Sequence, residues 1–331
     1  MRRPLEQVEF PGFAPEAQAR LRALLAASAD PDTALHFLER LRQEQPEAFV
    51  RLVATPEALR ILVAVFSQSR FLAEALLSHP GWVDRLLAPG LLERVRTAEE
   101  YTDQLEAFLV RQPPQQPLNL SLALFRRQQV LRVFVRDALG LTTLPEITEE
   151  LSNLADAILE AACRRIREQL VARHGEPRPE ADAGGAPCGF AVISLGKLGG
   201  KELNYSSDID LMFLYSANGA TDGPQRLTNK EFFRKLSNQL TELLSTYTAE
   251  GLCYRVDLRL RPEGRFGEVC IPLGAAQNYY RIRARDWELQ MLIKARVSAG
   301  DRRLGGELLE FVEPLTDSTT TDFSVVESAS A

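Results

Sequence analysis

Two aspartates placed two positions apart, Asp208 and Asp210, carry the clearest chemical signal in the sequence. The residues around and after them, through Tyr215, are mostly apolar, so the pair belongs to a predicted buried strand. Side chains two apart on a strand share one face, about 7 Å apart along the backbone. Because unpaired buried charge is costly, these carboxylates need a cation. The pattern predicts a site for a hard, oxygen-seeking ion, with Mg2+ as the obvious candidate.

A glycine-rich turn precedes the acidic pair. Residues 190–195 have the pattern of a short buried strand, and Gly196, Gly199 and Gly200 follow it. Glycine lets backbone N–H groups approach a phosphate closely, so strand, glycine-rich turn and acidic strand form a layout suited to nucleotides. A tight turn without a ligand is the alternative for each glycine. Three polar residues are further phosphate candidates, with plain exposure or turn formation as their alternative roles: Lys197, Ser206 and Ser207.

A third carboxylate lies on a later predicted strand. In residues 254–261 apolar and charged side chains alternate strictly, which places Asp257 among arginines on one strand face. Asp257 is therefore the third candidate ligand for the cation. Guanidinium groups bind phosphate oxygens in bidentate contacts, so three arginines are phosphate candidates: Arg255, Arg259 and Arg261. Ion pairs with Glu263 or Glu268 are the structural alternative for Arg259 and Arg261.

Histidine and cysteine chemistry is not favoured. The histidines lie in the helical half or the connection after it, away from the acids, so we expect no histidine base: His36, His79 and His174. Ser206 and Ser207 have no accompanying histidine and are not expected to be nucleophiles. The cysteines lack CxxC spacing, so we expect free structural thiols rather than zinc ligands or disulfides: Cys163, Cys188, Cys253 and Cys270.

Helix signals dominate residues 1–173. Thr55 followed by Pro56 is a strong helix start, and Thr97 with Glu100 has the form of a capping box. Long helices are expected at about 121–138 and 146–173. We predict a packed helical scaffold without a significant strand. Four arginines in the first long helix are predicted to form a solvated face: Arg126, Arg127, Arg132 and Arg136.

The sequence predicts an α+β protein with a helical N-terminal region and a later domain built on a small mixed sheet. The stretch 174–187 is rich in proline, glycine and charge, which indicates a surface connection. The predicted divisions are a helical region (1–173), a linker (174–187), a catalytic domain (188–300) and a C-terminal segment (301–331). The fold after about Glu313 is left open, because a polar run follows it.

Composition limits the class of protein. With 331 residues, of which 45% are hydrophobic, the chain is long enough for about two domains with substantial cores. A net charge of −6 argues against a broad nucleic-acid surface. No stretch approaches the length of a membrane span, and residues 1–6 lack the apolar core of a signal peptide. We therefore expect a cytoplasmic protein.

Longer motifs resemble known families. A Gly-Gly pair followed by Asp-Ile-Asp and a later strand aspartate resembles the nucleotidyltransferase superfamily that includes DNA polymerase beta. Three strings, at 195–210, 255–262 and 285–288, are similar to the glutamine synthetase adenylyltransferase/adenylyl-removing enzymes, and the similarity extends over about 120–300. It implies a polymerase-beta-like catalytic domain with Mg2+ bound by Asp208, Asp210 and Asp257. It also implies ATP, ADP and phosphate as ligands, with glutamine synthetase and the PII signal-transduction protein as partners.

The resemblance also favours one half of a bifunctional enzyme. Members of this family carry two homologous catalytic domains in tandem, whereas this chain has one copy of the acidic motif. Residues 204–210 and 255–257 are more similar to the N-terminal, adenylyl-removing copy. This similarity implies that the chain is the first part of a longer protein and that its C-terminal segment, 301–331, is truncated. The implied reaction is phosphorolysis, in which phosphate removes AMP from a tyrosine of glutamine synthetase and ADP leaves.

Three alternatives remain open at this point. The chain is the adenylylating half, a nucleotidyltransferase with another substrate, or a regulatory fragment without catalysis. The first two share the three acids with the favoured function, so the acids alone do not distinguish these functions. Measuring ADP release from adenylylated glutamine synthetase with Mg2+ and phosphate distinguishes them.

Overall fold

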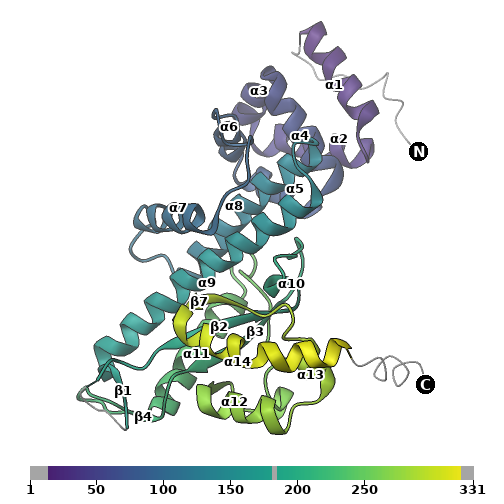
Figure 1. The fold of residues 1–331 in the computed structure, drawn as a ribbon. Helices are drawn as coiled ribbons and strands as arrows, with labels where there is room; N and C mark the ends of the chain where they lie inside the picture. Colours follow the sequence, from purple (N-terminus) through teal and green to yellow (C-terminus); the bar gives the residue numbers. More distant parts are fainter. Residues whose placement is uncertain (1–13, 181–184, 322–331) are drawn as a thin grey trace. The chain divides into compact units, whose positions relative to one another are not determined.

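The computed structural model describes residues 14–180 and 185–321 (Figure 1). Two compact units divide the chain: the first takes residues up to Val95 and Arg126–Ile147, and the second takes Arg96–Phe125 and the residues from Thr148 onward. Residues 96–125 and 148–173, which the sequence analysis assigned to the helical region, belong to the same unit as the sheet.

The first unit is built from short helices. Proline occupies the first position of α1 to α4, where its missing N–H costs nothing. Asp30 caps the second helix by accepting from the backbone N of Thr33 at 3.0 Å. The rings of Phe37 and Phe66 lie 5.5 Å apart and join the second helix to the fourth. The helices are α1 (Pro15–Ala27), α2 (Pro31–Glu44), α3 (Pro46–Ala54), α4 (Pro56–Gln68), α5 (Arg70–Ser78) and α6 (Gly81–Leu86).

Two long helices follow close to their predicted ranges. Helix α8 is Leu118–Ala138 and α9 is Leu144–His174, and each contains one of the unit boundaries. The described part of the chain before residue 174 contains helices and connections but no strand, as predicted.

The prediction of a solvated arginine face on α8 is wrong for two residues of the first unit. Arg132 and Arg136 are 2% and 1% exposed. Arg132 donates to the carbonyls of Leu91 and Arg94, both at 2.6 Å, and Arg136 donates to that of Leu92 at 3.1 Å. The segment 91–95 has no regular structure, so its carbonyls need donors from elsewhere, and these buried guanidinium groups supply them.

The second unit contains a five-stranded mixed sheet with β3 at its centre (Figure 1). On one side, β3 is antiparallel to β2, which is antiparallel to β7. On the other side, β3 is parallel to two short strands, β5 near its start and β6 near its end. The strands are β2 (Phe190–Leu195), β3 (Ile209–Tyr215), β5 (Val256–Asp257), β6 (Cys270–Pro272) and β7 (Arg296–Gly300). The expected α+β class with a small mixed sheet is confirmed.

Helices cover both faces of this sheet. On one face, strand residues such as Ile193 and Met212 pack in a single apolar cluster with residues of the last three helices, such as Tyr280 and Leu308. On the other face, the ring of Phe233 lies 5.0 Å from that of Tyr215. Besides parts of α8 and α9, the described helices of this unit are α7 (Ala98–Val110), α10 (Gly196–Gly199), α11 (Asn229–Ser245), α12 (Leu273–Ile282), α13 (Asp286–Gln290) and α14 (Arg302–Thr321), with the 3-10 turn η2 (Gly264–Phe266).

The linker and the C-terminal segment both contain regular secondary structure. The predicted linker contains β1 (Pro177–Pro179), which pairs antiparallel with β4 (Gly219–Thr221). In the described part of the C-terminal segment, whose fold after about Glu313 the sequence left open, α14 packs on β2 and β7 and carries buried Val312. Residues 322–331 lie outside the described part of the chain.

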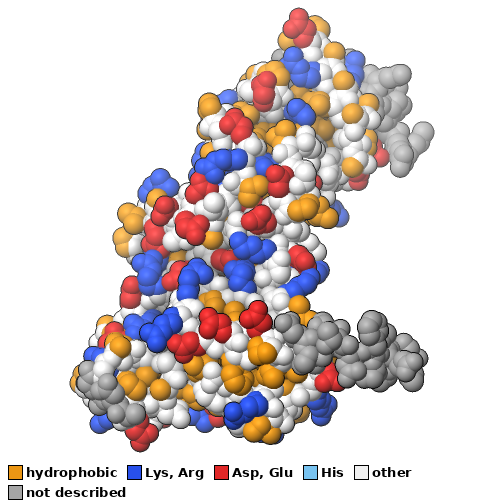
Figure 2. All heavy atoms as spheres, in the orientation of Figure 1, with side chains coloured by type: hydrophobic (Ala, Val, Ile, Leu, Met, Phe, Trp, Pro, Cys, Tyr) orange, Lys and Arg blue, Asp and Glu red, His pale blue; other side chains and the backbone are white. Residues whose placement is uncertain are grey.

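Surface charge is mixed on the face shown in Figure 2, where basic and acidic side chains are interspersed with apolar ones. Among the helices of the described residues, none is long and apolar enough to cross a membrane.

The four cysteines are free thiols, as predicted, and the structure buries all of them. Burial raises the pKa of the Cys163 thiol to about 12 and also raises that of Cys270. Because the thiolate is the reactive form, the native protein is expected to react slowly with dithionitrobenzoate at about pH 8, and all four thiols are expected to react after denaturation. The absorbance of the released thionitrobenzoate gives the number of reactive thiols in the native and in the denatured protein. Rapid reaction of four thiols in the native protein would contradict this burial.

Candidate active site

The sheet brings the three predicted acids to one end of its central strand. Asp210 in β3 lies in register with Asp257 of the parallel strand β5, and adjacent strands lie about 5 Å apart. Asp208 directly precedes β3. Burial raises the pKa of Asp210, and the negative charges of Asp257 and Asp208 raise it further. The three carboxylates therefore form one electrostatic cluster.

Arginines bind two of these carboxylates. Arg255 Nε forms a hydrogen-bonded ion pair with Asp208, and its Nη2 donates to the carbonyl of Ser206 at 3.0 Å. Arg259 donates to Asp257 from Nη2 at 2.5 Å and from its backbone N at 2.8 Å. These contacts hold the pKa of Asp257 below its usual range. The predicted proximity of arginines to the acids is thus present, with carboxylates as their partners in this structure.

The donor set fits a hard cation, because it consists of carboxylate oxygens with no thiolate or imidazole. With two of the carboxylates turned to arginines, no group of three or more acidic, histidine or cysteine side chains in the described residues is gathered tightly enough to hold a metal. The Asp208 and Asp257 side chains would therefore have to exchange an arginine for the ion.

The glycine turn contacts the central acid. Gly196 has φ +54°, and a Cβ at this position would lie 2.7 Å from Oδ2 of Asp210. Gly199 has a different role, because a Cβ there would lie 2.2 Å from the carbonyl oxygen of Lys294. Gly200 faces the Lys294 and Glu202 side chains. Of the three glycines, Gly196 therefore approaches the acids, while Gly199 and Gly200 allow the turn to pack closely against Lys294.

The remaining polar candidates have varied environments. Lys197 and Ser206 are exposed, and Ser207 is half-buried with its N–H donating to the Asn204 carbonyl at 3.3 Å. Arg261 donates to the carbonyls of Leu258 at 2.7 Å and of Gly267 at 3.0 Å, and burial lowers its pKa. Its guanidinium group thus stabilises the loop 258–268 through backbone carbonyls, whereas the structural alternative from the sequence was an ion pair with Glu263 or Glu268.

Sequence reasoning missed several polar residues behind the glycine turn. Asp156 of α9 forms a bidentate ion pair with Arg296 of β7, at 2.6 and 3.0 Å. Ser152 and Asn153 of α9 also contact the segment after the turn. The available signal was the spacing of Ser152 and Asp156, four residues apart and hence on one face of a helix whose neighbouring positions are apolar.

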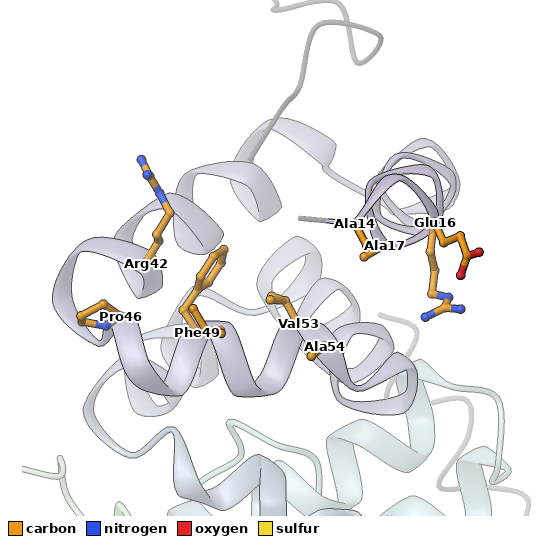
Figure 3. A pocket seen from close by; sticks show the side chains of 10 residues that line it. Ala14, Glu16, Ala17, Arg42, Pro46, Phe49, Val53 and Ala54 are labelled. Atoms are coloured by element: carbon orange, nitrogen blue, oxygen red, sulfur yellow. The ribbon is translucent and has the colours of Figure 1, made fainter. Parts of the chain in front are cut away.

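The first unit contains a separate hollow of about 480 Å3. Figure 3 shows lining residues from α3, the start of α1 and the end of α2, most of them apolar, including Ala14, Ala17, Phe49 and Val53. Among the described lining residues, the acid is Glu16, accompanied by Arg20 and Arg42. A hollow without a carboxylate cluster lacks the donors that phosphate-transfer chemistry with a metal requires.

Comparisons with known proteins support the resemblance seen in the sequence. Residues 59–311 match the family model described as glutamate-ammonia ligase adenylyltransferase. Similar proteins include three that are each named bifunctional glutamine synthetase adenylyltransferase/adenylyl-removing enzyme. The protein from Thioalkalivibrio sulfidiphilus is 40% identical over 259 residues, which are 78% of this chain and 26% of that protein.

The other two relatives agree with this match. The protein from Pseudomonas aeruginosa is 37% identical over 283 residues, or 85% of this chain and 29% of that protein. The protein from Nitrosococcus oceani is 36% identical over 310 residues, or 93% of this chain and 31% of that protein. The chain thus matches about a quarter to a third of the length of each of these relatives.

Proposed function

The chain belongs to the glutamate-ammonia ligase adenylyltransferase family, and we propose that it is the adenylyl-removing part of a bifunctional enzyme that acts on glutamine synthetase. The observation that supports catalysis most directly is the register of Asp210 with Asp257, with Asp208 just before the same strand. A scaffold without catalysis has no need to gather three like charges at one end of a sheet, because like charges repel.

The arrangement of the strands supports a catalytic domain of the polymerase-beta type. The strand with the Asp-x-Asp pair is central, antiparallel to the strand before the glycine turn, and parallel to a short strand with the third acid. We assign Asp208, Asp210 and Asp257 as the ligands of Mg2+. When bound, Mg2+ would supply positive charge at the phosphate oxygens.

The residues of the chain position the reactants. Arg255 and Arg259 are exposed beside the acids, where bidentate guanidinium contacts suit the oxygens of a phosphate group. Gly196 leaves room beside Asp210 for a close backbone approach. Lys197, Ser206 and Ser207 are further candidates for the phosphate or nucleotide. Such positioning and charge neutralisation account for most of the catalysis in phosphate-transfer reactions.

The proposed reaction is phosphorolysis of an adenylylated tyrosine on glutamine synthetase. An oxygen of inorganic phosphate forms a bond to the phosphorus of the AMP group, and the bond from that phosphorus to the tyrosine oxygen breaks. ADP leaves, and the tyrosine oxygen regains a proton. In the whole protein, a second catalytic part would transfer AMP from ATP, and the PII protein would regulate the balance in the cytoplasm.

Phosphate-dependent ADP release tests this proposal. The full chain is incubated with adenylylated glutamine synthetase and Mg2+, with and without inorganic phosphate, and ADP is measured by chromatography. We expect ADP only when phosphate is present. AMP transfer from ATP to the unmodified synthetase, without phosphate-dependent ADP release, would assign the chain to the adenylylating half instead. ADP release from a different adenylylated substrate alone would contradict the proposed partner.

A further inference from the structure

A polar patch on the buried side of α9 faces the glycine turn. Ser152, Asn153 and Asp156 are at most 6% exposed, and they belong to a helix whose neighbouring residues are buried and apolar. Buried polar side chains are costly unless they are hydrogen-bonded. Each of the three has a partner in or after the turn, or on the strand beside it.

A single guanidinium group joins this patch to the turn. Arg296 donates to both carboxylate oxygens of Asp156, at 2.6 and 3.0 Å. Its Nη2 also donates to the carbonyl of Leu198 at 3.0 Å, and its Nε donates to that of Gly199 at 3.3 Å. Helix α10 is a single turn, and at its end the Leu198 carbonyl also accepts from the backbone N of Lys201 at 3.2 Å. Arg296 is therefore a further donor to Leu198 and a donor to Gly199, while Asp156 fixes the guanidinium plane.

The residues after the turn are held in the same way. Lys201 has φ +56°, a left-handed conformation that non-glycine residues rarely adopt. Its Nζ donates to Oδ1 of Asn153 at 3.0 Å, and the next contact runs from the backbone N of Leu203 to Oγ of Ser152 at 3.2 Å. An unfavourable backbone conformation persists only where the surroundings determine it. Helix α9 therefore holds residues 201–203, and Arg296 holds residues 198–199 just before them.

The position of this turn matters because Gly196 at its start lies against Asp210. We propose that Asp156 and Arg296 are positioning residues, which hold the glycine turn in place beside Asp210 and thereby set the geometry of the metal- and phosphate-binding end of the sheet. The proposal rests on the function proposed above for that end. Neither residue touches the acids or the reactants, so both act through the turn.

The test uses two variants and a matched control on the same helix. Asp156→Asn keeps the shape of the side chain but removes its charge. Arg296→Lys keeps the ion pair but not the bridge to two carbonyls, and serves if Asp156→Asn does not fold. Glu160→Gln is the control, because Glu160 lies one turn further along α9 and accepts from the backbone N of Gly300 at 2.8 Å, without contacting the turn.

Three measurements separate positioning from general stability. Amide hydrogen exchange of residues 196–202 should become faster in Asp156→Asn and Arg296→Lys but not in Glu160→Gln. Mn2+ affinity, measured by electron paramagnetic resonance with the metal alone, should weaken by about tenfold or more in the first two variants. The kcat of ADP release should fall by a similar factor, with thermal unfolding recorded for all three variants.

Unchanged exchange in the turn, or Mn2+ affinity equal to that of the parent, would overturn the proposal. Equal losses in Glu160→Gln would also overturn it, because they would trace the effect to stability of the α9 packing. If the parent chain binds Mn2+ but releases no ADP, the proposed reaction fails while the exchange and Mn2+ results still decide the positioning role. If the parent does not bind Mn2+, the metal assignment and this proposal fail together.

Discussion

Replacing Asp210 by Asn is expected to reduce metal-dependent ADP release by about 10^3-fold. Asp210 is two positions after Asp208 and is paired in register with Asp257. It is therefore the central acid of the three. Asparagine has nearly the same shape but lacks the negative charge that binds a cation. Steady-state kinetics with phosphate and adenylylated glutamine synthetase measures the loss.

Stability should behave in the opposite direction in this variant. The half-buried Asp210 lies near two like charges, so removal of its charge relieves repulsion, and the unfolding temperature should be equal to that of the parent or higher. Asp222→Asn is the matched control, because Asp222 forms an exposed ion pair with Arg178 at 2.8 Å and takes no part in the acid cluster. Near-normal turnover in Asp210→Asn, or a comparable loss in Asp222→Asn, would contradict the assignment.

Replacing Gly199 by Ala is expected to destabilise the second unit by about 3 kcal/mol. A Cβ there would lie 2.2 Å from the carbonyl oxygen of Lys294 and 2.7 Å from that of Ser194. Both neighbours are backbone atoms, one of them in β2 and the other just before β7, so neither moves without disturbing the sheet. Circular dichroism during urea unfolding measures the change.

Gly306→Ala is the control for this effect. Gly306 lies in α14, and a Cβ there meets no other atom within 4 Å. Alanine favours helix over glycine by about 1 kcal/mol, so this variant should be slightly more stable than the parent. Parental stability in Gly199→Ala would show that the backbone of Lys294 does not pack against the turn as described.

Local patterns in the sequence predicted the elements and the three acids. The capping box of Thr97 and Glu100 is present at the start of α7, and the proline at position 56 begins α4. These signals operate within a few residues, where sequence spacing fixes geometry. The Asp-x-Asp spacing predicted Asp208 and Asp210 on one buried strand, but Asp208 is exposed and lies just before β3, and the sheet register brings Asp257 beside Asp210.

Contacts between distant segments were not predictable from such patterns. Asp156 and Arg296 are 140 positions apart, and Arg132 is buried because irregular backbone near Leu91 needs donors. Nothing local distinguishes these arginines from the exposed Arg255 and Arg259. The three glycines of the turn posed the same difficulty, because only the folded chain shows that Gly196 faces Asp210 and Gly199 faces Lys294.

The position of a bound metal tests the central assignment most directly. Crystals of the full chain grown with Mn2+ and an ADP-phosphate mixture would be measured at the manganese absorption edge. An anomalous peak is predicted within coordination distance of carboxylate oxygens from Asp208, Asp210 and Asp257, with Arg255 and Arg259 released from these acids. A peak elsewhere, or arginines still paired with Asp208 and Asp257 in crystals that bind the nucleotide, would contradict the assignment.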